Sequence, residues 1–324
     1  MSGNEGSAFT GSFGFFGAGR FAARCLELLL KWRPPSWIVT SPPSRAGRGN
    51  GLLPTPVEVF ARFSLPGIPI VNSSFVSRDV SVIDLAERYQ ASFCFVIDFG
   101  QRIEAPFLSL GQAGCLNIHP SLLPRYRGAA PVQRALMDCA GETGVTVFRL
   151  SEGMDAGPVL LRETIQIGED DDAGTLLERA ALAATSAFIK HAQRLPIGVW
   201  TFEPQNDALA TDAPKIRPEE ERIDWGKSAE KICGVVRALA PKPGAWTTSR
   251  GRRLKVLKAA RARLSSFGES ASTGGLLGLA EGGVGVASGE GNVILKEVQL
   301  DGKKIQAAAE WWNGLRAASG ERLL

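Results

Sequence analysis

The segment GCLNIHPSLLPRYRGAAP, residues 114 to 131, contains one of only two histidines in a chain of 324 residues. Asn117 and His119 lie two positions apart in an apolar run, so on a β-strand both side chains point to the same face. Imidazole is the usual acid–base group near neutral pH. A carboxamide and a protonated imidazole can also donate hydrogen bonds to a developing oxyanion. The pair therefore predicts chemistry at an acyl centre.

Asp155 belongs to a second motif, SEGMDAGP, which follows the apolar run VTVFRL at 145–150. Open α/β sheets bind ligands at the carboxyl ends of their strands, so we expect Asp155 to reach the same edge as Asn117 and His119. A carboxylate there would keep the imidazolium charged and assist proton transfer. His119 is paired with no serine or cysteine in a recognisable nucleophile motif. This favours direct acyl transfer between two bound substrates over a covalent acyl-enzyme.

Each of these residues also has a purely structural interpretation. A scarce histidine is often a hydrogen-bonded structural residue, Asn117 could cap a turn, and Asp155 could simply make one. The segment SLLP, residues 121–124, could be a packed loop before a helix. We favour the catalytic interpretation because the residues occur together, in this order and with these neighbours.

The elements that must position these residues are visible in the first 198 positions, where apolar runs alternate with helical patterns. Nearly continuous apolar runs are typical of strands buried on both faces of a parallel sheet. The pattern predicts a Rossmann-like parallel-sheet domain over 1–198. Strands are expected within 14–19, 36–41, 93–100, 115–119 and 145–150, and helices at 20–32, from Pro131 and at 174–195.

Residues 199–215 are irregular and suggest a linker, and the pattern changes again over 216–324. A short helix is expected at 229–239, followed by strand-like pieces between glycine turns, as in a small β-barrel or sandwich. The excess of basic residues concentrates in TSRGRRLKVLKAARAR at 248–263. That segment is either a solvated strand face or a surface that faces phosphate.

Composition narrows the class of protein. The chain is 44% hydrophobic and 22% charged with a net charge of +4, which is ordinary for a soluble globular protein. Its five cysteines are scattered, so we expect neither a disulfide framework nor a metal site. The absence of a long apolar run or an export signal favours a cytoplasmic protein that does not enter membranes. GAGRFA, residues 17–22, fits a dinucleotide fingerprint, but the second strand ends in Thr40 and Ser41 rather than an acidic residue, so we do not expect nicotinamide binding.

Asn-x-His followed by HPSLLPRYRGAAPVQRAL and ETGVTVFRLSEGMDAGPVL resembles the 10-formyltetrahydrofolate-dependent formyltransferase family. RGAAPVQRAL, the linker pattern APKIRPEEERIDW with VRALAPKPGAW, and RAGRGNGLLPTPV at 45–57 are similar to the members that formylate methionyl-initiator tRNA. The resemblance covers about residues 14 to 316. It departs at 98–106, where DFGQRIEAP stands in place of a common AYGLILP.

The resemblance implies roles for individual residues. Asn117, His119 and Asp155 match the catalytic trio, and Ser121, Leu122, Leu123 and Pro124 match the segment that borders the folate. The α-amine of methionyl-initiator tRNA would attack the formyl carbon of 10-formyltetrahydrofolate, with no metal. An OB-like domain at 216–324 would bind the acceptor arm, and we expect a monomer. The candidate RNA contacts are Arg45, Arg48, Arg250, Arg252 and Arg253, with Lys215 and Lys255 as weaker ones.

Two alternatives stay open at this point. The same trio could formylate an amino sugar or glycinamide ribonucleotide, although the latter activity would not need a second domain of about a hundred residues. The chain could also be a catalytically silent RNA-binding module, which the intact trio argues against. Assays with the different acceptors would separate these possibilities.

Overall fold

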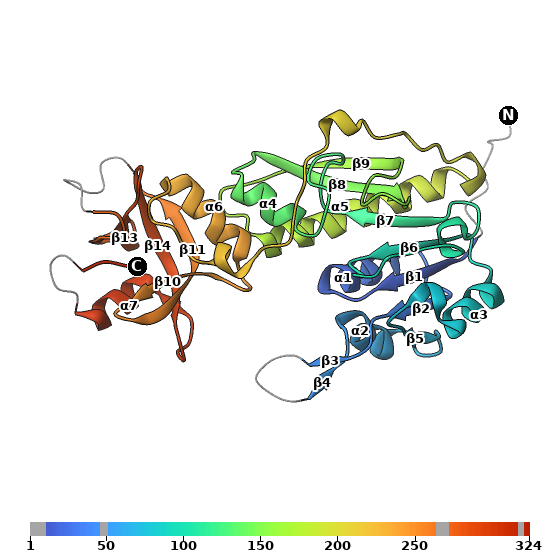
Figure 1. The fold of residues 1–324 in the computed structure, drawn as a ribbon, viewed down its shortest axis with the longest axis horizontal. Helices are drawn as coiled ribbons and strands as arrows, with labels where there is room; N and C mark the ends of the chain where they lie inside the picture. Colours follow the sequence, from blue (N-terminus) through green and yellow to red (C-terminus); the bar gives the residue numbers. More distant parts are fainter. Residues whose placement is uncertain (1–10, 46–50, 264–271, 317–320) are drawn as a thin grey trace, which may run out of the picture. The chain divides into compact units, whose positions relative to one another are not determined.

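The computed structural model describes residues 11–45, 51–263, 272–316 and 321–324 (Figure 1). The chain forms two compact units. Unit 1 comprises Met1–Gly128, Thr143–Ile165 and Leu177–Asp212, and unit 2 comprises Ala129–Glu142, Gln166–Leu176 and Ala213–Leu324. The domain boundaries 1–198, 199–215 and 216–324 stay a prediction. None of the helices within the described ranges has the length and apolarity needed to cross a bilayer.

A seven-stranded sheet has the strand order β5-β2-β1-β6-β7-β8-β9. β1, β2, β5, β6 and β7 pair in parallel, which confirms the predicted Rossmann-like sheet. β8 instead runs antiparallel to β7, so the expectation of a parallel strand at 145–150 was wrong. The strands are β1 (Phe13–Gly17), β2 (Trp37–Thr40), β5 (Ile70–Asn72), β6 (Phe93–Ile97), β7 (Cys115–His119), β8 (Glu142–Arg149) and β9 (Val159–Gln166).

Both faces of this sheet are covered, and its strands β1 and β6 are buried at every position. Alternate side chains of a strand point to opposite faces. Phe93 and Phe95 of β6 pack on Phe188 of helix α5 (Ala173–Arg194). Cys94 and Val96 join a second buried cluster that includes helix α3 (Val80–Tyr89). This burial on both faces explains why the sequence shows unbroken apolar runs rather than alternation.

Helix α1 (Arg20–Leu29) starts immediately after β1, and its start explains the glycine motif at 17–22. Gly19 occupies the N-cap and offers no side chain, while the N–H groups of Phe21 and Ala22 donate to the carboxylate of Asp98, just beyond β6. A β-carbon at Gly19 would lie 1.7 Å from Asp98 Oδ2. Glycine is therefore required by the close approach of this carboxylate, which occupies the helix start where a dinucleotide pyrophosphate would lie.

A two-stranded ribbon, β3 (Ser44–Arg45) and β4 (Leu52–Leu53), stands apart from the large sheet and precedes helix α2 (Pro56–Ser64). In Figure 1 the ribbon extends away from β2 and β5. Leu52 and Leu53 are 65% and 53% exposed, so the ribbon does not belong to the core of unit 1. Short 3-10 turns complete the described chain at η1 (Val76–Arg78), η2 (Phe107–Ser109), η3 (Ile197–Val199), η4 (Asp207–Leu209) and η5 (Pro218–Glu221).

Unit 2 is built on an antiparallel sheet in the order β10-β11-β14-β13-β12, with β15 added beside β14. This confirms a second, β-rich domain. Helices α4 (Pro131–Met137) and α6 (Ala229–Leu239) begin where the sequence predicted. They pack closely at Gly234, where a β-carbon would lie 2.6 Å from the Leu136 carbonyl oxygen. The remaining elements are β10 (Ala245–Ser249), β11 (Arg252–Arg261), β12 (Leu276–Ala280), β13 (Gly283–Ala287), β14 (Asn292–Leu300), β15 (Gln306–Ala307) and α7 (Ala308–Leu315).

Candidate active site

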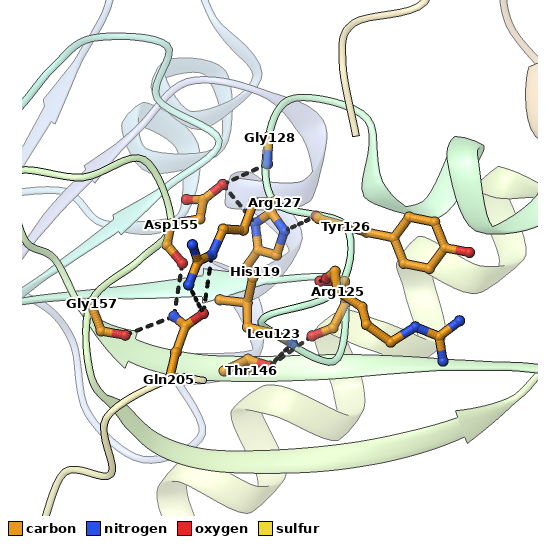
Figure 2. A network of polar contacts seen from close by, with 11 residues as sticks. His119, Leu123, Arg125, Tyr126, Arg127, Gly128, Thr146, Asp155, Gly157 and Gln205 are labelled. Carbon is orange, nitrogen blue, oxygen red and sulfur yellow. Dashed lines mark hydrogen bonds and ion pairs between the residues drawn. The ribbon is translucent and has the colours of Figure 1, made fainter. Parts of the chain in front are cut away.

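His119 ends β7 and is almost fully buried, with 5% of its surface exposed. Its Nε2 lies 2.8 Å from the carbonyl oxygen of Tyr126 (Figure 2). A carbonyl oxygen only accepts hydrogen bonds, so Nε2 carries a proton and donates it to Tyr126. Nδ1 is therefore the ring atom that can gain or lose a proton.

Asp155 faces that second nitrogen, with Oδ2 3.7 Å from Nδ1 of His119. The same Oδ2 accepts a hydrogen bond of 2.8 Å from the Gly128 N–H. Asp155 has φ of +50°, a left-handed backbone conformation that a non-glycine residue rarely adopts. The carboxylate is thus aimed at the imidazole by a tight turn and a backbone donor.

His119 and Asp155 lie close together as predicted, but the assumption behind that prediction, that β7 and β8 are parallel, was wrong. β8 is antiparallel to β7, and Arg149 at its end lies opposite Leu116 rather than opposite His119. The loop after β8 must bring Asp155 back to His119 (Figure 2). The approach therefore depends on the path of this loop and not on two parallel strand ends meeting at one edge.

The electrostatic balance at His119 has opposing causes. Burial lowers the pKa of His119 because it disfavours the charged imidazolium, whereas the Asp155 carboxylate raises it and the hydrogen bond to Tyr126 raises it further. The ring of Phe148 on β8 stands edge-on to the imidazole at 6.5 Å between centroids, which contributes to the apolar surroundings. The net effect is a lowered pKa of His119, and the Asp155 carboxylate is the larger of the two influences that favour its charged form.

Asn117 is the half-buried residue of an otherwise buried β7. It shares the His119 face of the strand by the two-residue period. Within the described parts of the chain, its carboxamide makes no hydrogen bond to another group. An amide of this kind, accessible and without a partner beside the imidazole, is available to donate to a bound oxygen.

Residues 121–124 form a loop that is held by hydrogen bonds before any ligand arrives. Thr146 lies opposite His119 on β8, and its hydroxyl donates to the Ser121 carbonyl oxygen at 2.7 Å while accepting from the Leu123 N–H at 3.0 Å. Ser121 and Leu123 are buried, whereas Leu122 and Pro124 are partly exposed. The alternation leaves Leu122 and Pro124 as the side chains able to border a ligand, and their role in folate binding stays a prediction.

Sequence reasoning missed Gln205, which lies in the segment interpreted as a linker. Its Nε2 donates to the carbonyl oxygens of Asp155 at 2.8 Å and Gly157 at 2.7 Å. Its Oε1 accepts from Arg127 at 2.8 and 3.2 Å (Figure 2). The sequence around Gln205 has no hydrophobic periodicity, so no local pattern predicts these hydrogen bonds.

A cavity of about 430 Å³ opens beside the segments that follow β5 and β6. It is lined in part by Phe75, Arg78, Gln101 and Arg102, and Phe75 is 77% exposed. Gln101 belongs to the segment that follows β6, and β6 is the neighbour of β7 in the sheet. The cavity thus combines an aromatic ring and two guanidinium groups with the carboxylate of Glu104, which lies 3.9 Å from Arg102.

The candidate RNA-binding arginines differ in their surroundings. Arg45 is exposed on β3, and Arg48 lies outside the described residues. Arg250, Arg252 and Arg253 are exposed near the start of β11, and each has an intramolecular partner. Arg250 pairs with Glu321 at 2.6 Å, Arg252 donates to the Asp301 carbonyl oxygen at 2.9 Å, and Arg253 lies 3.3 Å from Glu221 and over the Trp246 ring.

A parallel-dominated sheet that carries an amide, an imidazole and a carboxylate in this arrangement offers the groups that acyl transfer requires, and comparison with known proteins gives the class of enzyme. The Formyl transferase model matches residues 35–191, and the model of the Formyl transferase C-terminal domain matches residues 215–316. The chain belongs to the formyltransferase family and is an enzyme of that family.

Two relatives named methionyl-tRNA formyltransferase illustrate the similarity. The protein from Geobacter metallireducens is 35% identical, covering 95% of this chain and 97% of its own. The protein from Dictyoglomus thermophilum is 36% identical, covering 95% and 98%. Among solved structures, the sugar 3N-formyltransferase WlaRD has a TM-score of 0.64 at 20% identity, covering 90% of this chain and 98% of its own. HypX from Aquifex aeolicus in complex with tetrahydrofolic acid has a TM-score of 0.61 at 17% sequence identity, and the match covers 96% of this chain and 48% of HypX. These two likenesses show the fold.

Proposed function

We propose that the chain transfers a formyl group from 10-formyltetrahydrofolate to the α-amino group of methionyl-initiator tRNA, yielding N-formylmethionyl-tRNA for translation initiation. The observation that carries the proposal is the His119–Asp155 pair, on the same strand face as Asn117, whose amide makes no hydrogen bond to another described residue. The acceptor is supported by relatives with that name, which are matched over nearly their whole length.

The transfer needs no covalent intermediate on the enzyme. The acceptor nitrogen attacks the formyl carbon, and the carbonyl oxygen becomes an oxyanion that Asn117 and the Nδ1–H of a protonated His119 stabilise. At 3.7 Å the Asp155 carboxylate is too far for a hydrogen bond but close enough to favour the imidazolium. Collapse breaks the bond from the formyl carbon to N10. The attacking nitrogen loses a proton and N10 gains one, so tetrahydrofolate leaves.

The folate donor is supported by the fold family and by the site. The related structure of HypX from Aquifex aeolicus is a complex with tetrahydrofolic acid. In this chain, Leu122 and Pro124 are partly exposed on the loop that follows His119 and is held by Thr146. In the cavity, Phe75 and the guanidinium group of Arg78 could contact an aromatic ring that bears carboxylates.

The tRNA partner is supported by exposed arginines on both units. Arg45 stands on the ribbon β3–β4, and Arg250, Arg252 and Arg253 lie on unit 2. Guanidinium groups bind phosphate and base edges with two hydrogen bonds. We place the catalytic domain at 1–198, the linker at 199–215 and the tRNA-binding OB-like domain at 216–324. We further propose a cytoplasmic monomer.

The decisive test measures formyl transfer from 10-formyltetrahydrofolate to methionine charged on initiator tRNA, with elongator methionyl-tRNA, an amino-sugar nucleotide and glycinamide ribonucleotide in parallel. Transfer to initiator methionyl-tRNA above the uncatalysed rate supports the proposal. Transfer only to a small acceptor overturns the choice of acceptor, and RNA binding without any turnover overturns the enzymatic role.

A further inference from the structure

The segment 199–212 is part of the site rather than a free connection. Glu203 exchanges two backbone hydrogen bonds with Val159 of β9, at 2.7 and 2.8 Å. Thr211 accepts from the Tyr126 N–H through its side chain at 2.8 Å and from the Arg127 N–H through its carbonyl oxygen at 2.8 Å. The segment is therefore anchored on both sides of Gln205.

Gln205 joins two loops that are distant in sequence. One is the loop after β7, through Arg127; the other is the turn that carries Asp155, through the carbonyl oxygens of Asp155 and Gly157 (Figure 2). Because Arg127 only donates, it fixes the oxygen of the Gln205 amide on its own side. The NH₂ group must then face the two carbonyl oxygens. Asp207 accepts from the same guanidinium at 2.7 Å and so helps to orient Arg127.

The Asp155 turn needs such support. Its φ of +50° is unfavourable for a residue with a side chain, and conformations of this kind persist only where neighbouring groups hold them. The Gly128 N–H fixes one carboxylate oxygen, but it does not fix the backbone from which the side chain projects. The two bonds from Gln205 hold that backbone on both sides of Ala156.

We propose that Gln205 is a positioning residue, which fixes the turn of residues 155–157 and thereby sets the separation between the Asp155 carboxylate and Nδ1 of His119. Its catalytic consequence rests on the proposed function. The side chain of Gln205 contacts Arg127 and the backbone of Asp155 and Gly157, so it would act on His119 through Asp155.

The first test reads His119 directly and needs no activity. The chain contains two histidines, His119 and His191, so both ring-proton signals can be followed in an NMR titration of the full-length protein. His191 packs on the Trp200 ring and serves as an internal control. In Gln205→Ala the turn that carries Asp155 loses both hydrogen bonds to its backbone, so the carboxylate should move away from His119, and the pKa of His119 should fall while that of His191 stays. Unchanged titration of His119 would overturn the inference, whether or not the protein formylates tRNA.

The second test separates the two sides of the Gln205 amide. Gln205→Glu keeps an acceptor for Arg127, but its second oxygen cannot donate to the Asp155 and Gly157 carbonyls. Both variants should lose about 10–100-fold in kcat with KM values little changed, since misplacement of a catalytic group by about 1 Å costs up to roughly 10²-fold. Gln112→Glu, at an exposed position, is the matched control. Full activity of Gln205→Glu would show that Gln205 only anchors the segment through Arg127, which overturns the proposal.

Discussion

Asp155→Asn is the most informative single substitution because it removes a charge and little else. The asparagine oxygen can still accept from the Gly128 N–H, so the loop keeps its contact. What is lost is the attraction between the carboxylate and an imidazolium on His119. At 3.7 Å and an effective dielectric constant near 20, that attraction is about 4 kcal/mol.

If the imidazolium is needed in the transition state, 4 kcal/mol corresponds to a loss of about 10³-fold in kcat. The assay is single-turnover formyl transfer with both substrates saturating, repeated across roughly pH 6 to 8, where histidine titrates. Burial already lowers the pKa of His119 and Asp155 opposes this effect, so the variant should have a still lower pKa. Its defect should then be larger at high pH and smaller as the pH falls.

If Asp155→Asn stays within about threefold of the wild-type kcat over this pH range, charge on His119 is not what Asp155 supplies. A thermal unfolding curve that matches the wild type is the necessary control. Asp155→Ala, which also loses the Gly128 contact, should be at least as defective.

Four further predictions concern the Asn117 amide, RNA binding by Arg45, the stabilising contact of Glu220 and the start of helix α1 at Gly19. Asn117→Ala should lower kcat by about 10²–10³-fold with folate affinity little changed, measured by turnover and direct folate binding. Arg45→Ala should weaken use of methionyl-tRNA, and the slope of affinity against salt should fall by about one if Arg45 contacts a phosphate; altered folate affinity instead would contradict this role. Hydrogen bonds from Arg134 lower the pKa of Glu220 to about 2 from 4.5, so their stabilisation is present above pH 4.5 and lost as the pH falls towards 2. Denaturant titrations of Glu220→Gln should show a loss of about 1–2 kcal/mol at pH 7, allowing for solvent screening, and no difference near pH 2. Gly19→Ala should destabilise the protein by about 1–3 kcal/mol, and less than additively when combined with Asp98→Ala, since the clash is with that carboxylate.

The sequence is most informative where a local rule applies. The two-residue period of a strand places Asn117 and His119 on one face, and the structure agrees. Helices α4 and α6 begin at Pro131 and Ala229, where a proline in the first turn and a Ser228 cap mark the start. These features depend on neighbours within a few positions, which is why a single sequence reveals them.

The rest depends on long-range packing. No local pattern states that β8 reverses direction, so the approach of Asp155 was predicted for the wrong reason. Gln205 contacts residues 48 and 50 positions away from an irregular stretch, and nothing in that stretch shows it. Asp98 stood out only as a departure from a family pattern, while its contact with the start of α1 needed coordinates. In each case the residue that makes the contact is brought into place by the tertiary fold, and the residues next to it in the sequence do not determine it.

The bonds of Gln205 also bear on when the enzyme becomes competent during its synthesis. The hydrogen bonds from Arg127 to Gln205 span 78 positions, and contacts between residues so far apart form slowly because a long loop must close first. A nascent chain that ends before residue 205 already contains every strand of the seven-stranded sheet and all three candidate catalytic residues. It lacks the group that holds the Asp155 turn. Catalytic competence should therefore appear as a late step of folding, after the sheet itself is complete.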